Sequence, residues 1–177
     1  MRVNEILDIL SKDVDDGTKA IAQLCLLSYM IPPKGRIRTS KGHWKSSMSE
    51  SEESLVAHVK VAAHVASVRE SRVNVMNLQK LTVQPYIIVV GPTLDNIKAY
   101  FVSIDSILYS VPTAFEAIDV CFKSFHVFAA TYPPASEHIW YLIQRELYNF
   151  STKFDRPIGY IIEIMTALRA IGETEEI

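Results

Sequence analysis

Five consecutive apolar residues, Tyr86–Val90, limit what this chain can fold into more than any other feature of its sequence. Pro85 precedes this run and Gly91 and Pro92 follow it, so residues that end regular structure bound it on both sides. A strand with one solvated face alternates apolar and polar residues, whereas an unbroken apolar run is typical of a strand covered on both faces. The sequence therefore predicts a sheet with other elements packed against both of its sides.

Strand-like patterns flank this run. In residues 54–61, the apolar odd-numbered residues Leu55, Ala57, Val59 and Val61 alternate with Val56, His58 and Lys60, and this alternation predicts a strand. A helix with its apolar stripe over the same stretch is the competing interpretation. Two further apolar stretches, 99–104 and 107–111, are separated by only two residues, and this spacing predicts a hairpin. A helix over residues 63–80 is expected between the first two strands. The predicted order is therefore β-α-β-β-β.

Helices are predicted at both ends of the chain. Two short ones precede Pro32 and Pro33, which cannot donate a backbone hydrogen bond. Three more follow the predicted hairpin, and the last is expected to end at Gly172. The sequence thus predicts an α+β (mixed α/β) fold, in which a helical N-terminal hairpin precedes a small four-stranded sheet covered by three C-terminal helices.

The first of the C-terminal helices, over residues 113–130, has the clearest signals. Thr113 and Glu116 have the spacing of a capping box, in which a hydroxyl and a carboxylate satisfy two backbone amides at the helix start. An apolar stripe follows, and it predicts that Phe115, Phe122 and Phe128 face inward. This helix is therefore expected to supply much of the core on one side of the sheet.

The length of 177 residues fits one domain with a small appendage. We divide the chain into an N-terminal helical segment (1–33), an arm or linker that is first basic and then rich in serine and acid (34–53), an α+β core domain (54–172) and an acidic tail (173–177). Lys and Arg total 18 and Asp and Glu total 20, which gives a net charge of −2. This balance excludes a uniformly basic coat for nucleic acid but leaves room for a local basic patch.

The cysteines and the hydropathy of the chain indicate where in the cell the protein is expected. Cys25 and Cys121 both lie in apolar stretches and belong to no paired-cysteine motif, so the spacing of a zinc ribbon is missing. Glu5 and Asp8 stand where a signal peptide needs an apolar run. The longest uncharged stretches are 14 residues, too short for a membrane span. We therefore expect a soluble intracellular protein, cytoplasmic or nuclear, with no membrane partner.

The sequence offers few candidates for catalysis. It has no glycine-rich phosphate loop and no pair of histidines at metal-ligand spacing, so we expect neither a cofactor nor a metal. Cys121 lies on an apolar helical stripe, which favours a core side chain over a nucleophile. An enzyme with an unfamiliar site stays open, and its most plausible place is the end of the central strand, between Gly91 and Asp95. These signals lean against an enzyme.

A basic stretch in the arm is the one suggestive feature. Its candidate contacts for nucleic acid are Lys34, Arg36, Arg38, Lys41, Trp44 and Lys45. The cations would bind phosphates and the indole would stack on a base. A solvated loop is the favoured alternative, because the rest of the chain is mildly acidic and adds no attraction.

Three sets of residues together resemble a known kind of domain. They comprise Met30-Ile-Pro-Pro33 with Trp44 and Ser49-Glu-Ser-Glu-Glu-Ser54; Gln84-Pro-Tyr-Ile-Ile-Val-Val-Gly-Pro92; and Ala117-Ile-Asp-Val-Cys-Phe-Lys-Ser-Phe-His126 with Tyr132-Pro-Pro, Glu137-His-Ile-Trp140 and Phe150-Ser-Thr-Lys-Phe-Asp155. The chain, over about residues 27–171, resembles a domain of uncharacterised animal proteins, often in reading frames that look derived from mobile elements. The resemblance implies kinship but no reaction and no functional residues. Relatives with DNA-binding zinc fingers beside this domain lend no DNA-binding role, since this chain has no such finger.

These observations favour a non-enzymatic protein-interaction module with a protein partner, and the resemblance implies a mobile-element origin. A nucleic-acid-associated protein that uses the basic arm is the first alternative. An enzyme with a site near Gly91 and Asp95 is the second.

Overall fold

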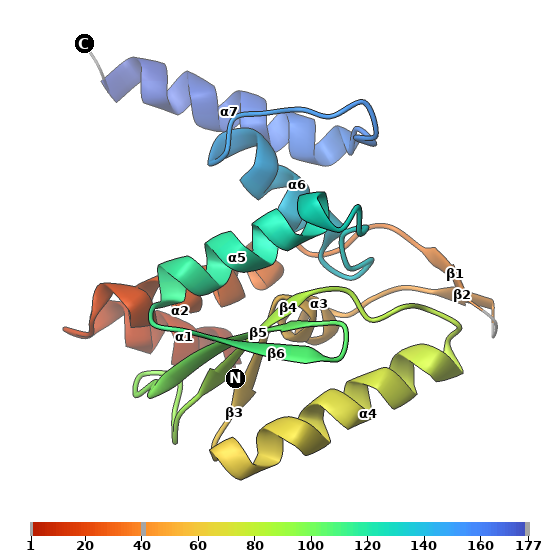
Figure 1. Cartoon of the computed structure of the whole chain (residues 1–177). Helices are drawn as coiled ribbons and strands as arrows, with labels where there is room; N and C mark the ends of the chain where they lie inside the picture. Colours follow the sequence, from red (N-terminus) through yellow and green to blue (C-terminus); the bar gives the residue numbers. More distant parts are fainter. Residues whose placement is uncertain (1, 40–41, 176–177) are drawn as a thin grey trace. The chain divides into compact units, whose positions relative to one another are not determined.

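The computed structural model describes residues 2–39 and 42–175, and these form two compact units, the first up to Ser136 and the second from Glu137. The chain is an α+β protein, as predicted (Figure 1). The elements of the first unit are α1 (Arg2–Ser11), α2 (Asp16–Met30), β1 (Ile37–Thr39), β2 (Gly42–Trp44), α3 (Met48–Leu55), β3 (Val56–Val59), a 3-10 turn (Ala62–His64), α4 (Val65–Leu78), β4 (Tyr86–Val90), β5 (Ala99–Ile104), β6 (Ile107–Val111) and α5 (Ala114–Val127). The second unit contains α6 (Glu137–Glu146) and α7 (Gly159–Glu175).

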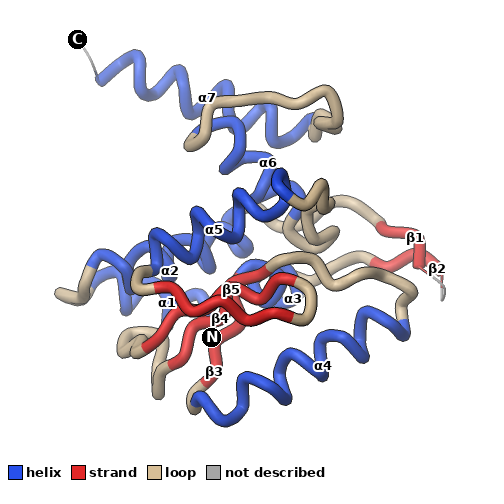
Figure 2. The backbone as a smooth tube through the Cα atoms, in the orientation of Figure 1, coloured by secondary structure: helices blue, strands red, loops and turns tan. Residues whose placement is uncertain are grey.

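The four-stranded sheet has the order β3-β4-β5-β6 (Figure 2). β3 pairs with β4 in parallel and the other pairs are antiparallel, so the predicted β-α-β-β-β order is confirmed. α4 is the crossover between the two parallel strands, which a short turn could not connect. The two-residue connection at Asp105 and Ser106 is a tight hairpin, and Asp105 has a φ of 50°, a conformation that Asp tolerates better than most residues.

All five residues of β4 are buried, as the apolar run predicts. Tyr86, Ile88 and Val90 pack in one cluster with Val65 of α4. Because side chains alternate along a strand, Ile87 and its neighbours at odd positions face the other side, where α5 packs against β4 and β5. Figure 1 shows α4 and α5 on opposite faces of the sheet.

The inner face of α5 is narrower than predicted. Cys121, Phe122 and Phe125 are buried, and Thr113 caps the helix by accepting a hydrogen bond from the Glu116 amide at 3.1 Å. Phe115, however, is 58% exposed, because it lies about 120° around the helix from Cys121. Phe128 is 60% exposed, because it is the C-cap residue and the helical stripe ends before it. The inward placement of these two phenylalanines was wrong.

The second half of the predicted arm is a helix. Residues 48–55 form α3, which starts with a capping box between Ser47 and Glu50, and the following strand is only the four residues Val56–Val59. The strand predicted over 54–61 therefore begins later and ends earlier. The capping box and the buried Leu55 explain the change, because they make 48–55 a short helix anchored at both ends.

Three C-terminal helices were predicted to cover the sheet. Of these, α5 belongs to the unit that contains the sheet, whereas α6 and α7 make up the second unit. Arg169 and Glu146 form an ion pair of 2.8 Å between the two helices. α7 continues past Gly172 to Glu175, so the predicted end at Gly172 was wrong. A glycine inside a helix costs about 1 kcal/mol, which weakens a helix but does not break it as proline would. None of the described helices is both long and apolar enough to cross a bilayer.

Candidate functional site

The basic arm contains a two-stranded hairpin rather than an irregular loop. β1 and β2 pair antiparallel, with Arg38 opposite His43 and Ile37 opposite Trp44. Opposite residues share a face and neighbours alternate, so the two faces of this hairpin differ. Arg38 and His43 are exposed on one face, whereas Ile37 and Trp44 are half-buried on the other. The structure thus separates the predicted aromatic contact from the predicted cationic ones.

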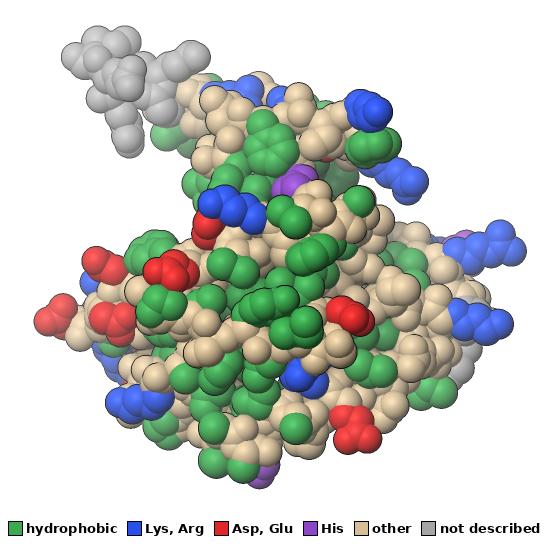
Figure 3. Space-filling model, in the orientation of Figure 1, with side chains coloured by type: hydrophobic (Ala, Val, Ile, Leu, Met, Phe, Trp, Pro, Cys, Tyr) green, Lys and Arg blue, Asp and Glu red, His purple; other side chains and the backbone are tan. Residues whose placement is uncertain are grey.

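The remaining cations of the arm flank this exposed face. Arg36 immediately precedes β1, Lys45 immediately follows β2, and both are exposed, as is Lys34. The predicted contact Lys41 lies outside the described residues. Figure 3 shows Lys and Arg side chains projecting at the end of the first unit where Figure 1 places β1 and β2. The face formed by Arg36, Arg38, His43 and Lys45 is called the cationic face below.

The cations of this face are not neutralised by the fold. Within the described parts of the chain, no ion pair engages Arg36, Arg38 or Lys45. Two other exposed lysines behave differently: Lys12 lies 2.8 Å from Asp8, and Lys123 lies 2.7 Å from Asp119. The sequence has no acid between Asp16 and Glu50, so the hairpin has no local partner for its charges. Its positive charge is available to a ligand.

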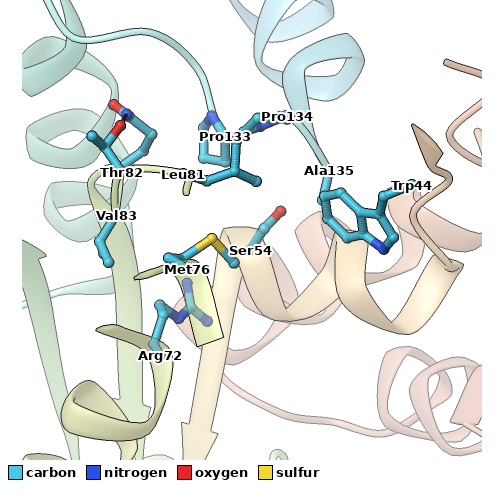
Figure 4. A pocket seen from close by; sticks show the side chains of 11 residues that line it. Trp44, Ser54, Arg72, Met76, Leu81, Thr82, Val83, Pro133, Pro134 and Ala135 are labelled. Carbon is cyan, nitrogen blue, oxygen red and sulfur yellow. Dashed lines mark hydrogen bonds between the residues drawn. The ribbon is translucent and has the colours of Figure 1, made fainter. Parts of the chain in front are cut away.

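A partly open pocket lies beside the face of the hairpin that carries Trp44 (Figure 4). Segments far apart in sequence line it: β2, the end of α3, the C-terminal half of α4, the loop before β4 and the segment after α5. Most of its lining is apolar, with Trp44, Met76, Leu81 and Pro133 among the side chains drawn in Figure 4. Trp44 therefore belongs to both the hairpin and the pocket wall.

Arg72 is the one charged residue in the lining of this pocket. Its Cζ lies 3.6 Å from the centroid of the Tyr86 ring, and its Nη2 donates a hydrogen bond to the carbonyl oxygen of Glu53. Among the described residues it has no carboxylate within ion-pair distance. Burial lowers the pKa of the Arg72 guanidinium, which nevertheless stays protonated because free arginine titrates above about 12. The pocket thus combines a mostly apolar wall with a half-buried cation.

The end of the central strand, the place of the hypothetical enzyme site, is a closely packed turn. The imidazole Nε2 of His58 lies 2.8 Å from the carbonyl oxygen of Gly91. Asp95 accepts from Thr93 and from Lys12, and these hydrogen bonds lower the pKa of its carboxyl group. A Cβ at Gly91 would lie 2.2 Å from the Asn96 carbonyl oxygen, so the turn needs glycine for close backbone approach. These polar groups bind one another and hold the turn.

Both cysteines are free thiols in the core. Cys25 and Cys121 are buried, and burial raises the pKa of each thiol. A reactive cysteine needs an exposed, electropositive surrounding, which neither has. In residues 2–39 and 42–175, no three His, Cys, Asp or Glu side chains gather as a metal site would require.

A buried carboxylate in the acidic run is a feature that sequence reasoning missed. Glu52 of α3 is 6% exposed and accepts hydrogen bonds from Arg2 Nη2 at 2.6 Å and from the Tyr29 hydroxyl at 2.6 Å. Although burial opposes it, pairing with Glu52 raises the pKa of Arg2, and burial together with Glu52 raises the pKa of Tyr29. Glu52 thus ties α1 and α2 to α3. The sequence contains Glu50, Glu52 and Glu53 close together, and nothing in it indicates which of the three is buried.

The cationic face and the pocket are the two features of the described residues that have the character of binding surfaces, since fixed charges and apolar hollows select ligands by complementarity. They lie on opposite faces of the β1–β2 hairpin, whose Trp44 lines the pocket, and this end of the first unit is therefore the candidate functional site. Its cations and its tryptophan are predicted from the sequence, whereas Arg72 is not. Comparison of the chain with protein-family models, with curated proteins and with solved structures finds no match.

Proposed function

We propose that this chain is a non-enzymatic protein-interaction module whose β1–β2 hairpin binds an extended acidic segment of a partner protein. The observation that carries the proposal is the cationic face, where Arg36, Arg38 and Lys45 are exposed and enter no ion pair within the described residues. Rim charges of this kind steer association and select partners of opposite sign.

The edges of the hairpin support a polypeptide partner. Within the described residues β1 pairs only with β2, and each strand has an outer edge without a neighbour. An extended peptide can add a strand to such an edge, because its backbone supplies matching donors and acceptors. Alternate side chains of the added strand would then face the cationic face, so alternating acids fit best.

The position of Trp44 argues against single-stranded nucleic acid on this surface. Such binders combine cations and aromatic side chains in one groove, where phosphates and bases are held together. In this hairpin Trp44 is on the face opposite Arg38 and lines the apolar pocket. A strand whose phosphates lie on the cations would have no indole to stack on. A protein partner is therefore the better fit.

An intracellular location, in cytosol or nucleus, and a mobile-element origin are parts of the same proposal. The free thiols of Cys25 and Cys121 support the location, because reducing compartments keep thiols unpaired. The resemblance described above supports the origin and remains a prediction.

The test measures fluorescence anisotropy of a labelled decamer of alternating Glu and Val at low and moderate salt. Its controls are a decamer with the same residues in two blocks and a mixed-sequence single-stranded oligonucleotide. We expect the alternating peptide to bind best and to weaken with salt, because the contacts are exposed. Tighter binding of the oligonucleotide, or no binding of the alternating peptide, would refute the proposal.

A charge-matched pair of variants locates the contact. Replacing Arg36, Arg38 and Lys45 by Ala removes three exposed cations from the cationic face. Replacing Lys60, Lys98 and Arg156 by Ala removes three exposed cations elsewhere. At about 0.5 kcal/mol for each exposed charge pair, the first variant should weaken binding roughly tenfold and the second by less than about twofold. Equal losses would mean that net charge, not the hairpin, attracts the peptide.

A further inference from the structure

The pocket beside Trp44 holds a cation in surroundings that are costly for a lone charge. Arg72 reaches it from α4 and borders the same hollow as Met76 and Leu81 (Figure 4). A charge taken out of water is stabilised only when it is paired and hydrogen-bonded. The Tyr86 ring, one backbone carbonyl and the more distant Glu53 carboxylate meet part of this need, and the described residues place no carboxylate within ion-pair distance.

We infer that this pocket is a binding site for a carboxylate attached to an apolar group. The carboxylate would pair with the Arg72 guanidinium, whose fork of N–H donors matches two carboxylate oxygens. The apolar group would lie against Met76, Leu81 and Pro133. Apart from Arg72, most of the surface that lines the pocket is apolar, which suits a ligand that combines one carboxylate with an apolar body. This inference does not depend on the proposed function of the cationic face.

Two sources supply such a group: a small free acid, or the carboxyl terminus of a polypeptide that ends in an apolar residue. Both present one carboxylate next to an apolar body, so Arg72 would serve either in the same way. A multiply charged ligand fits less well, because the described lining offers one cation and otherwise mostly apolar surface. The chemistry of the pocket therefore selects monocarboxylates.

The primary experiment is isothermal titration of the full chain with 4-phenylbutyrate and, in parallel, with its neutral primary amide. We expect saturable binding of the acid at millimolar concentration or tighter and at least tenfold weaker binding of the amide. Trp44 lines the pocket, so the acid should also change tryptophan fluorescence, and Trp44→Phe should remove that change. Equal affinity for acid and amide, or no saturable binding of the acid, would overturn the inference.

Two variants separate charge from space. Arg72→Met removes the cation and should abolish the preference for the acid over the amide. Because Arg72 also contacts Tyr86, this variant is paired with Met76→Trp, which leaves the cation in place and fills the hollow. Met76→Trp should abolish binding of both compounds, whereas Asn77→Trp, on an exposed residue of the same helix, should bind the acid like the wild type. An unchanged affinity in Met76→Trp would place the ligand elsewhere and overturn the inference.

A third arm identifies the source. A hexapeptide that ends in Phe is titrated with a free and with an amidated carboxyl terminus. Binding of the free form at least tenfold tighter than 4-phenylbutyrate supports a polypeptide terminus as the natural ligand. Tighter binding of phenylbutyrate supports a small acid, and both results depend on Arg72 if the inference is right.

Discussion

The two halves of the segment from residue 34 to residue 53 use charge in opposite ways. In the first half, Arg36, Arg38 and Lys45 lie exposed along a hairpin and enter no ion pair in the described chain. In the second half, Glu52 is buried and bound by Arg2 and Tyr29. The comparison teaches that a run of like charges is not one kind of feature. A charge that the fold itself satisfies is structural, and one that the fold leaves unpaired is available for binding.

The largest difference in stability between a buried and an exposed side chain is expected in the apolar core. Phe122 is 1% exposed on the face of α5 that packs on the sheet, whereas Phe115 on the same helix is mostly exposed. Phe122→Ala should lower the free energy of unfolding by about 3–5 kcal/mol, the range for a buried phenylalanine. Phe115→Ala should cost less than about 1 kcal/mol. Urea denaturation of both variants checks this, and similar losses would mean that the inner face of α5 is assigned wrongly.

Two neighbouring glutamates of α3, Glu52 and Glu53, test whether the acidic half of the segment contributes to stability. Glu52→Ala leaves the Tyr29 hydroxyl without its acceptor and Arg2 with only the exposed Glu5, and it should cost about 1–3 kcal/mol. Glu53→Ala changes an exposed side chain and should cost less than about 0.5 kcal/mol. Thermal and urea denaturation give both values. If Glu53 proved the costlier of the two, the contrast between the halves would fail.

Asp15 represents an intermediate kind of charge, exposed but hydrogen-bonded. It caps α2 by accepting bonds from the side chain and backbone amide of Thr18, and these bonds lower the pKa of its carboxyl group. Since the folded pKa is below the unfolded one, its contribution is complete above the unfolded pKa of about 4 and disappears as the pH falls through the lowered folded pKa.

Asp15→Ala should therefore cost about 1 kcal/mol near neutral pH, the usual loss for an N-cap, and progressively less towards pH 2.5. Asp13→Ala, on an exposed residue outside the helix, should cost little at any pH. Urea denaturation between pH 2.5 and pH 7 follows both variants. If the difference in the free energy of unfolding between Asp15→Ala and wild type stayed constant across this range, the ionised carboxylate could not be its cause.

The smallest effect is expected on the cationic face. Replacing Arg36, Arg38 and Lys45 by Ala together should change the free energy of unfolding by less than about 1 kcal/mol, because exposed charges without partners stabilise little. Trp44→Ala, on the other face of the hairpin, should cost more than the triple variant, because the indole is half-buried. Calorimetric melting of both proteins makes the comparison. A triple variant that melts below Trp44→Ala would show that these cations hold the fold together.

Local patterns predicted the sheet well. The run at β4, the two-residue gap at Asp105 and the Thr113 cap each depend on neighbours in sequence, and the structure has the first two in full and, of the predicted capping box, the bond that the Thr113 hydroxyl accepts. The buried Glu52 could not be predicted, because its partners Arg2 and Tyr29 are 50 and 23 residues away. Nothing in a single sequence shows which of several adjacent glutamates meets a distant arginine.

The candidate site likewise has a part that could be predicted from the sequence and a part that could not. The cations of the arm stand out in the sequence by their number and by the lack of nearby acids. The face of Trp44 depends on the register of the hairpin, and a shift by one residue would turn it to the other side. Arg72 became part of the site only because the end of α4 lies beside β2 and the segment that contains Pro133. Such meetings of remote segments are a property of the tertiary fold.

The turn at Gly91 has a consequence for genetics. A Cβ at this position would meet backbone atoms of Asn96 and Ile97, and these cannot rotate away as a side chain can. Gly35 and Gly159 have no atom within 4 Å of the same added carbon. In a library of missense alleles, almost every change at Gly91 should therefore score as a loss of folded protein, while changes at Gly35 and Gly159 should be silent for abundance. Position 91 would also be a natural source of temperature-sensitive alleles.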